Sequence, residues 1–428
     1  MGSEATKNDE AWEALFNRYD IPGEIARKGF FEITATQINE KREARLMTKF
    51  DHRINLPALF SKNRLAILPV TRGSYVIAPF DAYKAFEEST SSLTRIPFPN
   101  YVESLNPTHI TSEAAAINCA YLSGMFTDFL GEEQLLPTVS GRMGSGSFAF
   151  KIRESLKKTD LLLQVNSSQM EIDGGYEGPE SLTLIEAKNF LSEDFLVRQL
   201  YYPFRFWSGA VRKPVRCVFL VYTNGVFSLY EYVFADPEHY NSLELVKHKN
   251  YSIDAEAISQ DEIRGLLPKL PLLSEPELAF PQADSLKRVI NLCELLMQGE
   301  KSRDEITLNY AFDPRQTNYY TDAGRYLGLI GKRHEGREPL YFMTEEGRRT
   351  MDLPYKLRQL SFARAILSHG PFRKTYEQCL KEGRMPSRTE IADIMRTCGL
   401  HQVEKESTYL RRASTVAGWV KWILDLSL

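Results

Sequence analysis

The feature that most constrains this 428-residue chain is a β-rich segment interrupted by one tight-turn signal. In VFLVYTNGVFSLYEYVF (218–234), Asn224 and Gly225 stand between two arms of aliphatic and aromatic residues. Both turn residues accept a positive φ, which a two-residue hairpin requires, so the segment predicts a β-hairpin. The apolar sides of its strands need a covering layer, which points to a sheet packed against helices or a second sheet.

The residues before this hairpin provide the other elements of such a sheet. A helix is predicted at 111–130, and residues 193–207 predict another, kinked or broken near Pro203. Strand-like runs occur at 160–165, 169–173, 182–189 and 217–222. We therefore expect an α/β (α+β) multidomain protein with a mixed sheet flanked by helices.

The length of the chain requires more than one domain, because single hydrophobic cores stop growing at about 250–300 residues. The expected order is an N-terminal α+β domain at 1–100, the mixed-sheet domain at 101–255, a linker at 256–282, a winged-helix domain at 283–355 and a helical or helix-turn-helix domain at 356–428. No apolar run approaches the roughly 20 residues that span a bilayer, and the N-terminus has no secretory signal, so we expect a cytoplasmic protein.

The N-terminal domain is predicted to contain helices at 9–16 and 35–50 and strands within 64–79, with a turn at 71–73. Between Arg27 and Arg72 there are ten basic and four acidic residues. This surplus makes the segment a candidate for contact with DNA phosphates, with a solvated surface as the alternative.

Two acidic residues and a lysine end two neighbouring strands of the predicted sheet. Asp173 lies near the end of one strand, and Glu186 and Lys188 lie at the end of the next, after a Gly/Pro loop. Alternation puts Glu186 and Lys188 on one face, next to Asp173 across the hairpin. Two carboxylates held close together need a compensating cation, and Mg²⁺ prefers oxygen ligands and can activate a water. The pattern indicates phosphodiester hydrolysis, with a surface hairpin carrying a salt bridge as the alternative.

At these residues the sequence resembles the PD-(D/E)XK nuclease superfamily, and more narrowly the type II restriction endonucleases. The resemblance rests on Asp173 and on Glu186-Ala187-Lys188, and covers roughly residues 105–235. It implies an αβββαβ core, dependence on Mg²⁺ with Mn²⁺ as a substitute, and cleavage that leaves 5′-phosphate and 3′-hydroxyl ends. The implied metal ligands are Asp173, Glu186 and Ala187. Ile172 stands where a proline would precede Asp173, a position that varies in the superfamily.

Two further site residues enter through the resemblance. Glu113, on the preceding helix, matches an acidic residue that often assists the metal site, and Gln199 matches a functional Gln on the following helix. A glutamate just after a helix start also fits a capping or helix-dipole role, so both interpretations stay open for Glu113. The implied catalytic set is Asp173, Glu186, Lys188, Glu113 and Gln199.

Residues 283–352 have the order of elements of a winged helix. Helices are predicted at 283–298, 302–308 and 317–329, followed by a hairpin with its turn at 332–337 and its returning strand at 340–343. Arg, Gln and Asn side chains pair with base edges. The residues expected on or beside the recognition helix include these types and are Arg315, Gln316, Thr317, Asn318, Tyr319 and Arg325. The wing is expected to place Lys332, Arg333 and Arg337 against phosphates.

The last 73 residues predict two more helices, at 387–397 and 407–426. The second begins with basic and polar residues, among them Arg411, Arg412 and Ser414, which fits a helix-turn-helix that meets DNA. From residue 281 onward there are 24 Lys and Arg against 19 Asp and Glu, although the whole chain has a net charge of −3. A basic C-terminal part suits DNA contact. For both C-terminal units the alternative is a helical protein-interaction or dimerisation module.

These patterns predict a Mg²⁺-dependent, sequence-specific double-stranded DNA endonuclease, that is, a type II restriction enzyme. Double-stranded DNA is the expected partner, and a palindromic target would favour a homodimer. A cognate DNA methyltransferase would be a genetic rather than a physical partner. Two alternatives stay open: a structure-specific repair nuclease with the same core, and a non-catalytic DNA-binding regulator.

Overall fold

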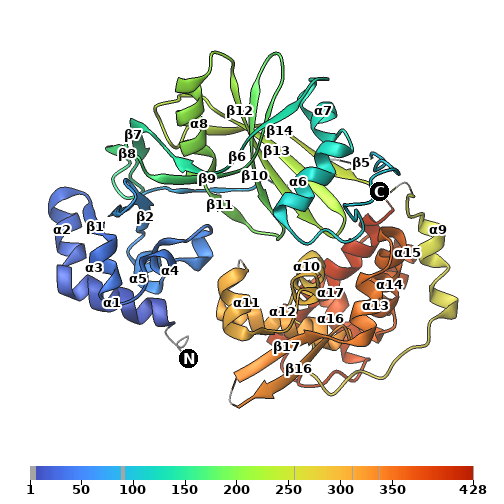
Figure 1. The fold of residues 1–428 in the computed structure, drawn as a ribbon. Helices are drawn as coiled ribbons and strands as arrows, with labels where there is room; N and C mark the ends of the chain where they lie inside the picture. The colour runs from blue at the N-terminus through green and yellow to red at the C-terminus, as the bar shows by residue number, and fades with distance from the viewer. Residues whose placement is uncertain (1–5, 88–91, 255, 311, 337, 428) are drawn as a thin grey trace. The chain divides into compact units, whose positions relative to one another are not determined.

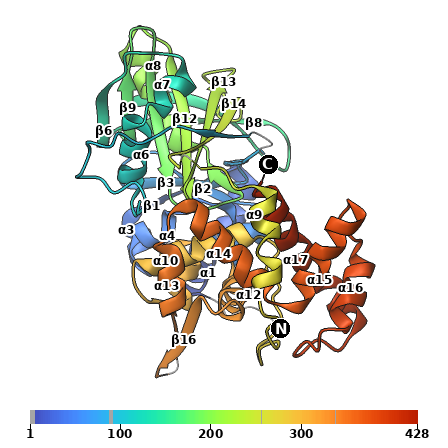
Figure 2. The ribbon, with the colours of Figure 1, turned by 90° about the vertical axis from the view of Figure 1, so that its right-hand side faces the viewer.

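The computed structural model describes residues 6–87, 92–254, 256–310, 312–336 and 338–427, which form a mixed α/β multidomain fold (Figures 1 and 2). The chain divides into two compact units. The first comprises residues 1–93, 112–222 and 227–250, and the second comprises 94–111, 223–226 and 251–428. Among the described helices, none has the length and apolar character needed to cross a membrane.

A seven-stranded mixed sheet of order β5-β14-β13-β12-β10-β9-β6 carries the predicted site. Its strands are β5 (Leu93–Arg95), β6 (Leu136–Gly144), β9 (Gln169–Glu177), β10 (Leu182–Lys188), β12 (Val215–Thr223), β13 (Val226–Phe234) and β14 (Leu243–Ser252). Strand β9 is antiparallel to both β6 and β10, whereas β12 is parallel to β10. Asn224 and Gly225, with φ values of 50° and 75°, join β12 to β13 and confirm the predicted hairpin.

Helices α6 (Glu113–Leu122) and α8 (Arg198–Ala210) both pack on β9 and β10, and in Figure 1 the strands lie between them. The chain order α6, β6, β9, β10, α8, β12 follows the expected αβββαβ core. The predicted single helix at 111–130 is in fact two, because Gly124 takes a φ of 77° and separates α6 from α7 (Met125–Leu130). Pro203 lies inside α8 without ending it, and the residues just before α8 form β11 (Asp194–Leu196) instead of helix.

Two small sheets complete the surroundings of the central one. The hairpin of β7 (Ser147–Arg153) and β8 (Asp160–Asn166) is inserted between β6 and β9, and β11 pairs with β4 (Tyr83–Ala85). Aromatic residues of α8, among them Tyr201 and Tyr202, are fully buried against Phe150 of β7 and against strand β12. This core fixes the start of α8 near the end of β10.

The N-terminal segment forms a small three-stranded sheet of order β1-β3-β2, covered by short helices. Its elements are α1 (Lys7–Tyr19), α2 (Ile21–Lys28), β1 (Phe31–Thr34), α3 (Ala35–Asn39), α4 (Ala44–Thr48), a 3-10 turn η1 (Arg53–Asn55), α5 (Ala58–Lys62), β2 (Ala66–Pro69) and β3 (Ser74–Ala78). The first helix and the two strands joined by a turn were predicted. The predicted helix at 35–50 is interrupted between Asn39 and Ala44, and it ends at Thr48.

The second unit contains a three-stranded sheet of order β15-β17-β16 with helices around it. Its elements are α9 (Gln260–Arg264), η2 (Leu267–Lys269), α10 (Leu286–Met297), β15 (Lys301–Ser302), α11 (Arg303–Asn309), α12 (Pro314–Tyr326), β16 (Ile330–Glu335), β17 (Glu338–Met343), α13 (Glu345–Met351), α14 (Tyr355–Leu367), α15 (Gly370–Glu382), α16 (Arg388–Arg396) and α17 (Glu406–Asp425). Elements α10 to β17 have the chain order of a winged helix. Figure 2 shows α15, α16 and α17 side by side.

Candidate active site

The β9–β10 hairpin brings together the three residues on which the prediction rests. Gly174 pairs with Ile185 and Gly175 with Leu184, so Asp173 and Glu186 come next to each other one step beyond the end of the ladder. All seven residues of β10 are buried, because β10 lies between β9 and β12 and under two helices. The carboxylate of Asp173 accepts a hydrogen bond from the backbone N of Ala187 at 2.8 Å. This bond holds Asp173 at the end of β10.

The two glycines after Asp173 allow neighbouring elements to approach closely. A Cβ atom on Gly175 would lie 2.7 Å from Cβ of Val139 on β6, and one on Gly174 would lie 3.3 Å from Ile117 on α6. A side chain at either position would therefore push β6 or α6 away. The close approach of α6 carries Glu113, its first residue, towards the hairpin end.

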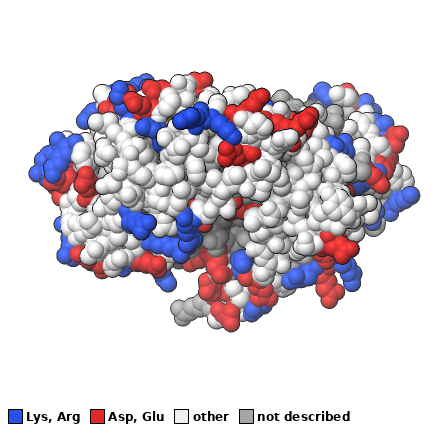
Figure 3. Space-filling model, turned by 45° about the horizontal axis from the view of Figure 1, so that its top comes forward, with Lys and Arg blue, Asp and Glu red and all other residues white. Residues whose placement is uncertain are grey.

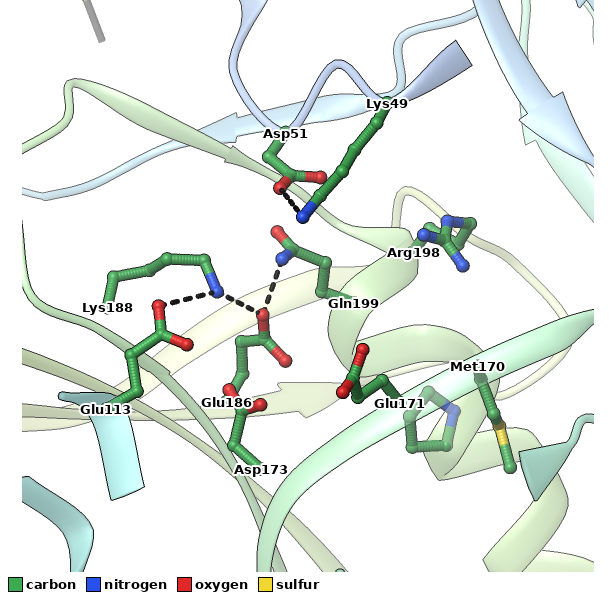
Figure 4. Close-up of a pocket in the computed structure, with 11 residues that line it drawn as sticks. Lys49, Asp51, Glu113, Met170, Glu171, Asp173, Glu186, Lys188, Arg198 and Gln199 are labelled. Carbon is green, nitrogen blue, oxygen red and sulfur yellow. Dashed lines mark hydrogen bonds and ion pairs between the residues drawn. The ribbon is translucent and has the colours of Figure 1, made fainter. Parts of the chain in front are cut away.

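Lys188 is the centre of the polar cluster in Figure 4. Its ammonium lies 2.7 Å from Oε1 of Glu186 and 3.5 Å from Oε1 of Glu113, and it donates to the carbonyl of Ala187 at 2.9 Å. The side chains of Lys188 and Glu186 are only 10% and 9% exposed, whereas that of Glu113 is 40% exposed. The predicted catalytic residues Asp173, Glu186, Lys188 and Glu113 are thus found together.

Gln199, near the start of α8, completes the predicted set. Its amide nitrogen donates to Oε1 of Glu186, the same oxygen that Lys188 contacts. Its own carbonyl oxygen is buried and has no hydrogen-bond partner among the described residues. The preceding residue, Arg198, lies over the ring of Tyr202 and also lines the pocket. Gln199 therefore fixes one Glu186 oxygen and leaves the other for a different partner.

The cluster contains more negative than positive charge, and its pKa values reflect this. Burial raises the pKa of Glu186 to about 8, and nearby Asp173 adds to the rise, although Lys188 opposes it. Burial also raises the pKa of Glu113, again with Lys188 opposing. Burial disfavours the Lys188 ammonium, but the carboxylates of Glu186 and Glu113 outweigh burial and raise its pKa. One ammonium thus compensates three carboxylates only in part.

Two residues of the N-terminal segment belong to the same pocket, and the sequence analysis did not identify them. The pocket has a volume of about 170 Å³ and is lined by Lys49, Asp51, Glu113, Met170, Glu171, Asp173, Glu186, Lys188, Arg198, Gln199 and Pro203. Figure 4 shows Lys49 and Asp51 extending from a neighbouring loop. The carbonyl of Asp51 accepts a hydrogen bond from the backbone N of Leu196 at 2.9 Å, which ties this loop to β11. The sequence signal that pointed to this segment at all was its surplus of basic residues at 27–72.

The donor groups at the hairpin end suit Mg²⁺. Asp173 and Glu186 supply two carboxylates, and the residue that directly follows Glu186, Ala187, supplies a backbone carbonyl. The described residues contain no group of three His, Cys, Asp or Glu side chains arranged to hold a metal ion. Mg²⁺ commonly uses only one or two carboxylates, with waters and substrate phosphates as its other ligands. The surplus negative charge around Lys188 also favours a divalent cation, so the residues present fit this ion.

On α12, the predicted DNA-contacting residues differ in exposure. Asp313 caps the helix, which begins at Pro314, three residues before the predicted start. Arg315 and Asn318 are exposed and Tyr319 is half-buried, while the Gln316 side chain bonds back to the backbone of the cap. Arg325 is paired with Asp322 at 2.8 Å. The prediction for Thr317 needs correction: this residue is fully buried, and its hydroxyl lies 2.8 Å from that of Thr307 on α11, so it faces the core.

The two predicted wing residues that the structure describes lie on a strand and not in a turn. Lys332 and Arg333 are exposed residues of β16, which continues to Glu335, because the hairpin is tighter than the sequence suggested. Arg333 is paired with Glu300 at 2.5 Å. Arg337 lies outside the described residues. Lys332 is the predicted wing cation that stays exposed without an ion pair in the described chain.

The basic start of α17 lies beside α12. Arg411 is exposed, whereas Arg412 is half-buried, and burial lowers the pKa of Arg412 while Tyr319 and Asp322 of α12 oppose the change. Ser414 is half-buried, and its hydroxyl oxygen lies 3.1 Å from Oδ1 of Asp284 and 2.7 Å from the carbonyl oxygen of Arg411. It therefore ties α17 to the residues before α10.

Charges of both signs are mixed on the face shown in Figure 3, where Lys and Arg lie among Asp and Glu around a wide uncharged area. A large field of one sign therefore does not cover this face. On this face, any basic surface that could contact a polyanion is therefore local.

Comparison with family models gives three matches, each covering less than half of the chain. Residues 9–77 match the domain of unknown function DUF6996, 78–252 match the domain of unknown function DUF6997, and 288–427 match the domain of unknown function DUF7226. Comparison with curated proteins and with solved structures yields no match. Lys49 and Asp51 lie in the first matched region, and the rest of the pocket lies in the second.

Proposed function

We propose that this protein is a Mg²⁺-dependent, sequence-specific double-stranded DNA endonuclease. The observation that carries the proposal is the single buried ammonium of Lys188 among the carboxylates of Glu186, Glu113 and Asp173. Buried clusters with unbalanced charge are costly for folding, and strongly shifted pKa values concentrate at functional sites. The cluster lies at the ends of β9 and β10 and lines a pocket of about 170 Å³, which gives a phosphodiester access.

Five groups at the hairpin end have a defined part in this hydrolysis. Asp173, Glu186 and the carbonyl of Ala187 would hold Mg²⁺, which when bound lowers the pKa of a water and stabilises negative charge on the phosphate. Lys188 orients the attacking water or donates to a phosphate oxygen, and Gln199 keeps Glu186 in place. The water oxygen bonds to phosphorus as the bond to the 3′ oxygen breaks. The attacking water releases one proton to the solvent and the 3′ oxygen takes one up from it, so the products carry a 5′-phosphate and a 3′-hydroxyl.

Site selection in this proposal belongs to the C-terminal unit. The exposed Arg315 and Asn318 of α12 would read base edges, and Lys332 of β16 and Arg411 of α17 would contact phosphates. Double-stranded DNA is therefore the proposed partner.

The test is digestion of plasmids of known sequence by Asp173→Ala and Lys188→Ala variants in Mg²⁺. Loss of a metal ligand, or of the ammonium that orients the attacking water or contacts the phosphate, should slow cleavage by about 10³-fold or more, while DNA binding in Ca²⁺ persists. Lys213→Ala is the matched control, because Lys213 pairs with Glu177 at the other end of the same hairpin. Cleavage by both variants at the wild-type rate would reject the proposal.

The digestion pattern separates the alternatives. Discrete bands are expected from a sequence-specific enzyme, whereas cleavage confined to flaps or junctions would indicate a repair nuclease. A wild-type protein that binds DNA but cuts none of these substrates in Mg²⁺ or Mn²⁺ would be a regulator.

A further inference from the structure

A second, larger groove adjoins the candidate active site within the first unit. It has a volume of about 460 Å³ and is lined by the end of α4, the β2–β3 turn, the β6–β9 edge and the start of α8. The lining residues that it shares with the candidate active site are Lys49, Asp51, Met170, Glu171 and Arg198. Because of these shared residues, a chain-like ligand in the groove can continue into the pocket.

The groove is basic. Two of its lining residues are acidic, Asp51 and Glu171, and five are basic: Arg45, Lys49, Arg72, Arg142 and Arg198. Two of the five cations are compensated, since Lys49 lies 3.8 Å from Asp51 and Arg142 lies 3.3 Å from Glu171.

The other three cations have no acidic partner in the described part of the chain. Arg45 and Arg72 are exposed, and neither forms an ion pair there. Arg198 has a buried Nε without a hydrogen-bond partner among the described residues. Three uncompensated guanidinium groups along one groove fit a ligand with repeated negative charge.

A buried hydroxyl also points to a ligand. Ser168 lines the groove and directly precedes β9. It is fully buried, and its Oγ has no hydrogen-bond partner among the described residues. A buried hydroxyl without a partner costs free energy, which a bound acceptor would recover. Serine hydroxyls are common donors to phosphate oxygens.

We propose that this groove binds the sugar-phosphate backbone of the DNA strand next to the bond being cut. Arg45, Arg72 and Arg198 contact its phosphates, and Ser168 donates to a phosphate oxygen. This inference rests on the proposed function, because continuity with a phosphodiester-cleaving pocket is what selects DNA among polyanions. The contacts reach phosphates and not bases, so they position the strand without reading its sequence.

The test compares the DNA affinity of the double variant Arg45→Ala/Arg72→Ala, here the groove variant, with that of the wild type. Affinity is measured by fluorescence anisotropy in Ca²⁺, so that binding is observed without cleavage. The matched control is Lys41→Ala/Arg212→Ala, which removes two exposed cations outside the groove. Two duplexes of unrelated sequence are used. The groove variant should bind both about 10- to 100-fold more weakly, and the slope of log K against log salt should fall by about 2, while the control stays near the wild type.

The outcomes separate this inference from the proposed function. If the wild type cuts DNA but the groove variant binds with unchanged affinity and salt dependence, the groove assignment is overturned and the endonuclease stands. Suppose instead that the wild type binds DNA but never cuts it, and that the groove variant, unlike the control variant, loses DNA affinity. The groove assignment then stands and the endonuclease is rejected. An equal loss of affinity in the control variant would also overturn the groove, because the effect would then be one of overall charge.

Discussion

The ammonium of Lys188 lies 2.7 Å from Oε1 of Glu186, and neither side chain is more than one-tenth exposed. Such a pair is stable only if its surroundings supply the hydrogen bonds that water would otherwise provide. Here they are supplied by Gln199, which donates to Glu186, and by the Ala187 carbonyl, which accepts from Lys188. Asp173 and Glu113 add two further carboxylates, and this excess of negative charge makes the pair sensitive to protons and cations.

Mg²⁺ affinity should depend on pH. The pKa of Glu186 is raised to about 8, so without metal this carboxyl is mainly protonated at pH 7 and ionises as the pH rises. Mg²⁺ binds the ionised form and must displace the proton, so its apparent affinity should rise about fivefold from pH 7 to pH 8 and about tenfold from pH 7 to pH 9, and level off above that. Calorimetry in two buffers of different ionisation enthalpy would measure the released proton. Equal affinity at pH 6.5 and pH 9 would contradict this assignment.

Glu186→Gln should change the pH dependence of stability in metal-free buffer. The folded-state pKa of Glu186 lies above the ordinary value of 4.5, so its contribution to stability is fully present below that value and is lost as the pH rises through about 8. The glutamine variant lacks this loss. Its free energy of unfolding relative to the wild type should therefore increase by roughly 2–3 kcal/mol between pH 6 and pH 9. Urea titrations in EDTA would show it, and a constant difference across this range would disprove it.

Gln199→Ala should weaken Mg²⁺ binding although Gln199 is not a metal ligand. Its amide holds one oxygen of Glu186, and loss of a residue that orients a ligand commonly lowers metal affinity about 10- to 100-fold. Gln199→Glu should in addition raise the pKa of Glu186 and move the pH profile of cleavage to higher pH. The exposed Gln134 offers a control, since Gln134→Ala should change neither quantity. If Gln199→Ala leaves both the Mg²⁺ affinity and the profile unchanged, Gln199 has no positioning role.

The parts of the fold that were predictable are those encoded locally. The Asn224-Gly225 turn, the alternating strands and the Asp173 to Lys188 hairpin depend on neighbours within about 20 residues, and all were found. Lys49 and Asp51 were missed because they reach the pocket through tertiary packing of the 49–51 loop on β11, more than 120 residues away in sequence.

The errors on α12 and β16 have a related cause. Helical periodicity predicts that one face of α12 is buried, but the buried face is set by α11, and Thr317 falls on it. The hairpin between β16 and β17 is closed by a two-residue connection, so Lys332 and Arg333 pair in the ladder and do not lie in the turn.

Neighbouring substitutions on α12 should have different effects. Asn318→Ala removes an exposed side chain and should reduce discrimination between the cognate site and sites with one altered base pair, by about 1–3 kcal/mol, with little change in melting temperature. Thr317→Val removes a buried hydroxyl bonded to Thr307 and should lower stability by about 1–3 kcal/mol while preserving discrimination. Competition binding and urea unfolding on both variants test the pair. The reverse pattern would mean that α12 does not read bases.

The ion pair between Arg216 on β12 and Glu231 on β13 should contribute to stability and not to cleavage. Nε and Nη2 of Arg216 donate to the two carboxylate oxygens of Glu231 at 2.6 and 2.9 Å, and Nη1 donates to the carbonyl of Leu130 at 2.9 Å. The side chain of Glu231 is only 9% exposed, so Glu231→Ala would leave a guanidinium partly buried without its main partner. We expect a loss of about 3–5 kcal/mol in the free energy of unfolding. Asp160→Ala, which removes a partly exposed carboxylate 3.8 Å from Arg153 and 3.1 Å from His239, should cost about 1 kcal/mol. Urea unfolding measures both, and cleavage assayed well below the melting temperature should be unaffected by either, because neither pair lines the candidate active site.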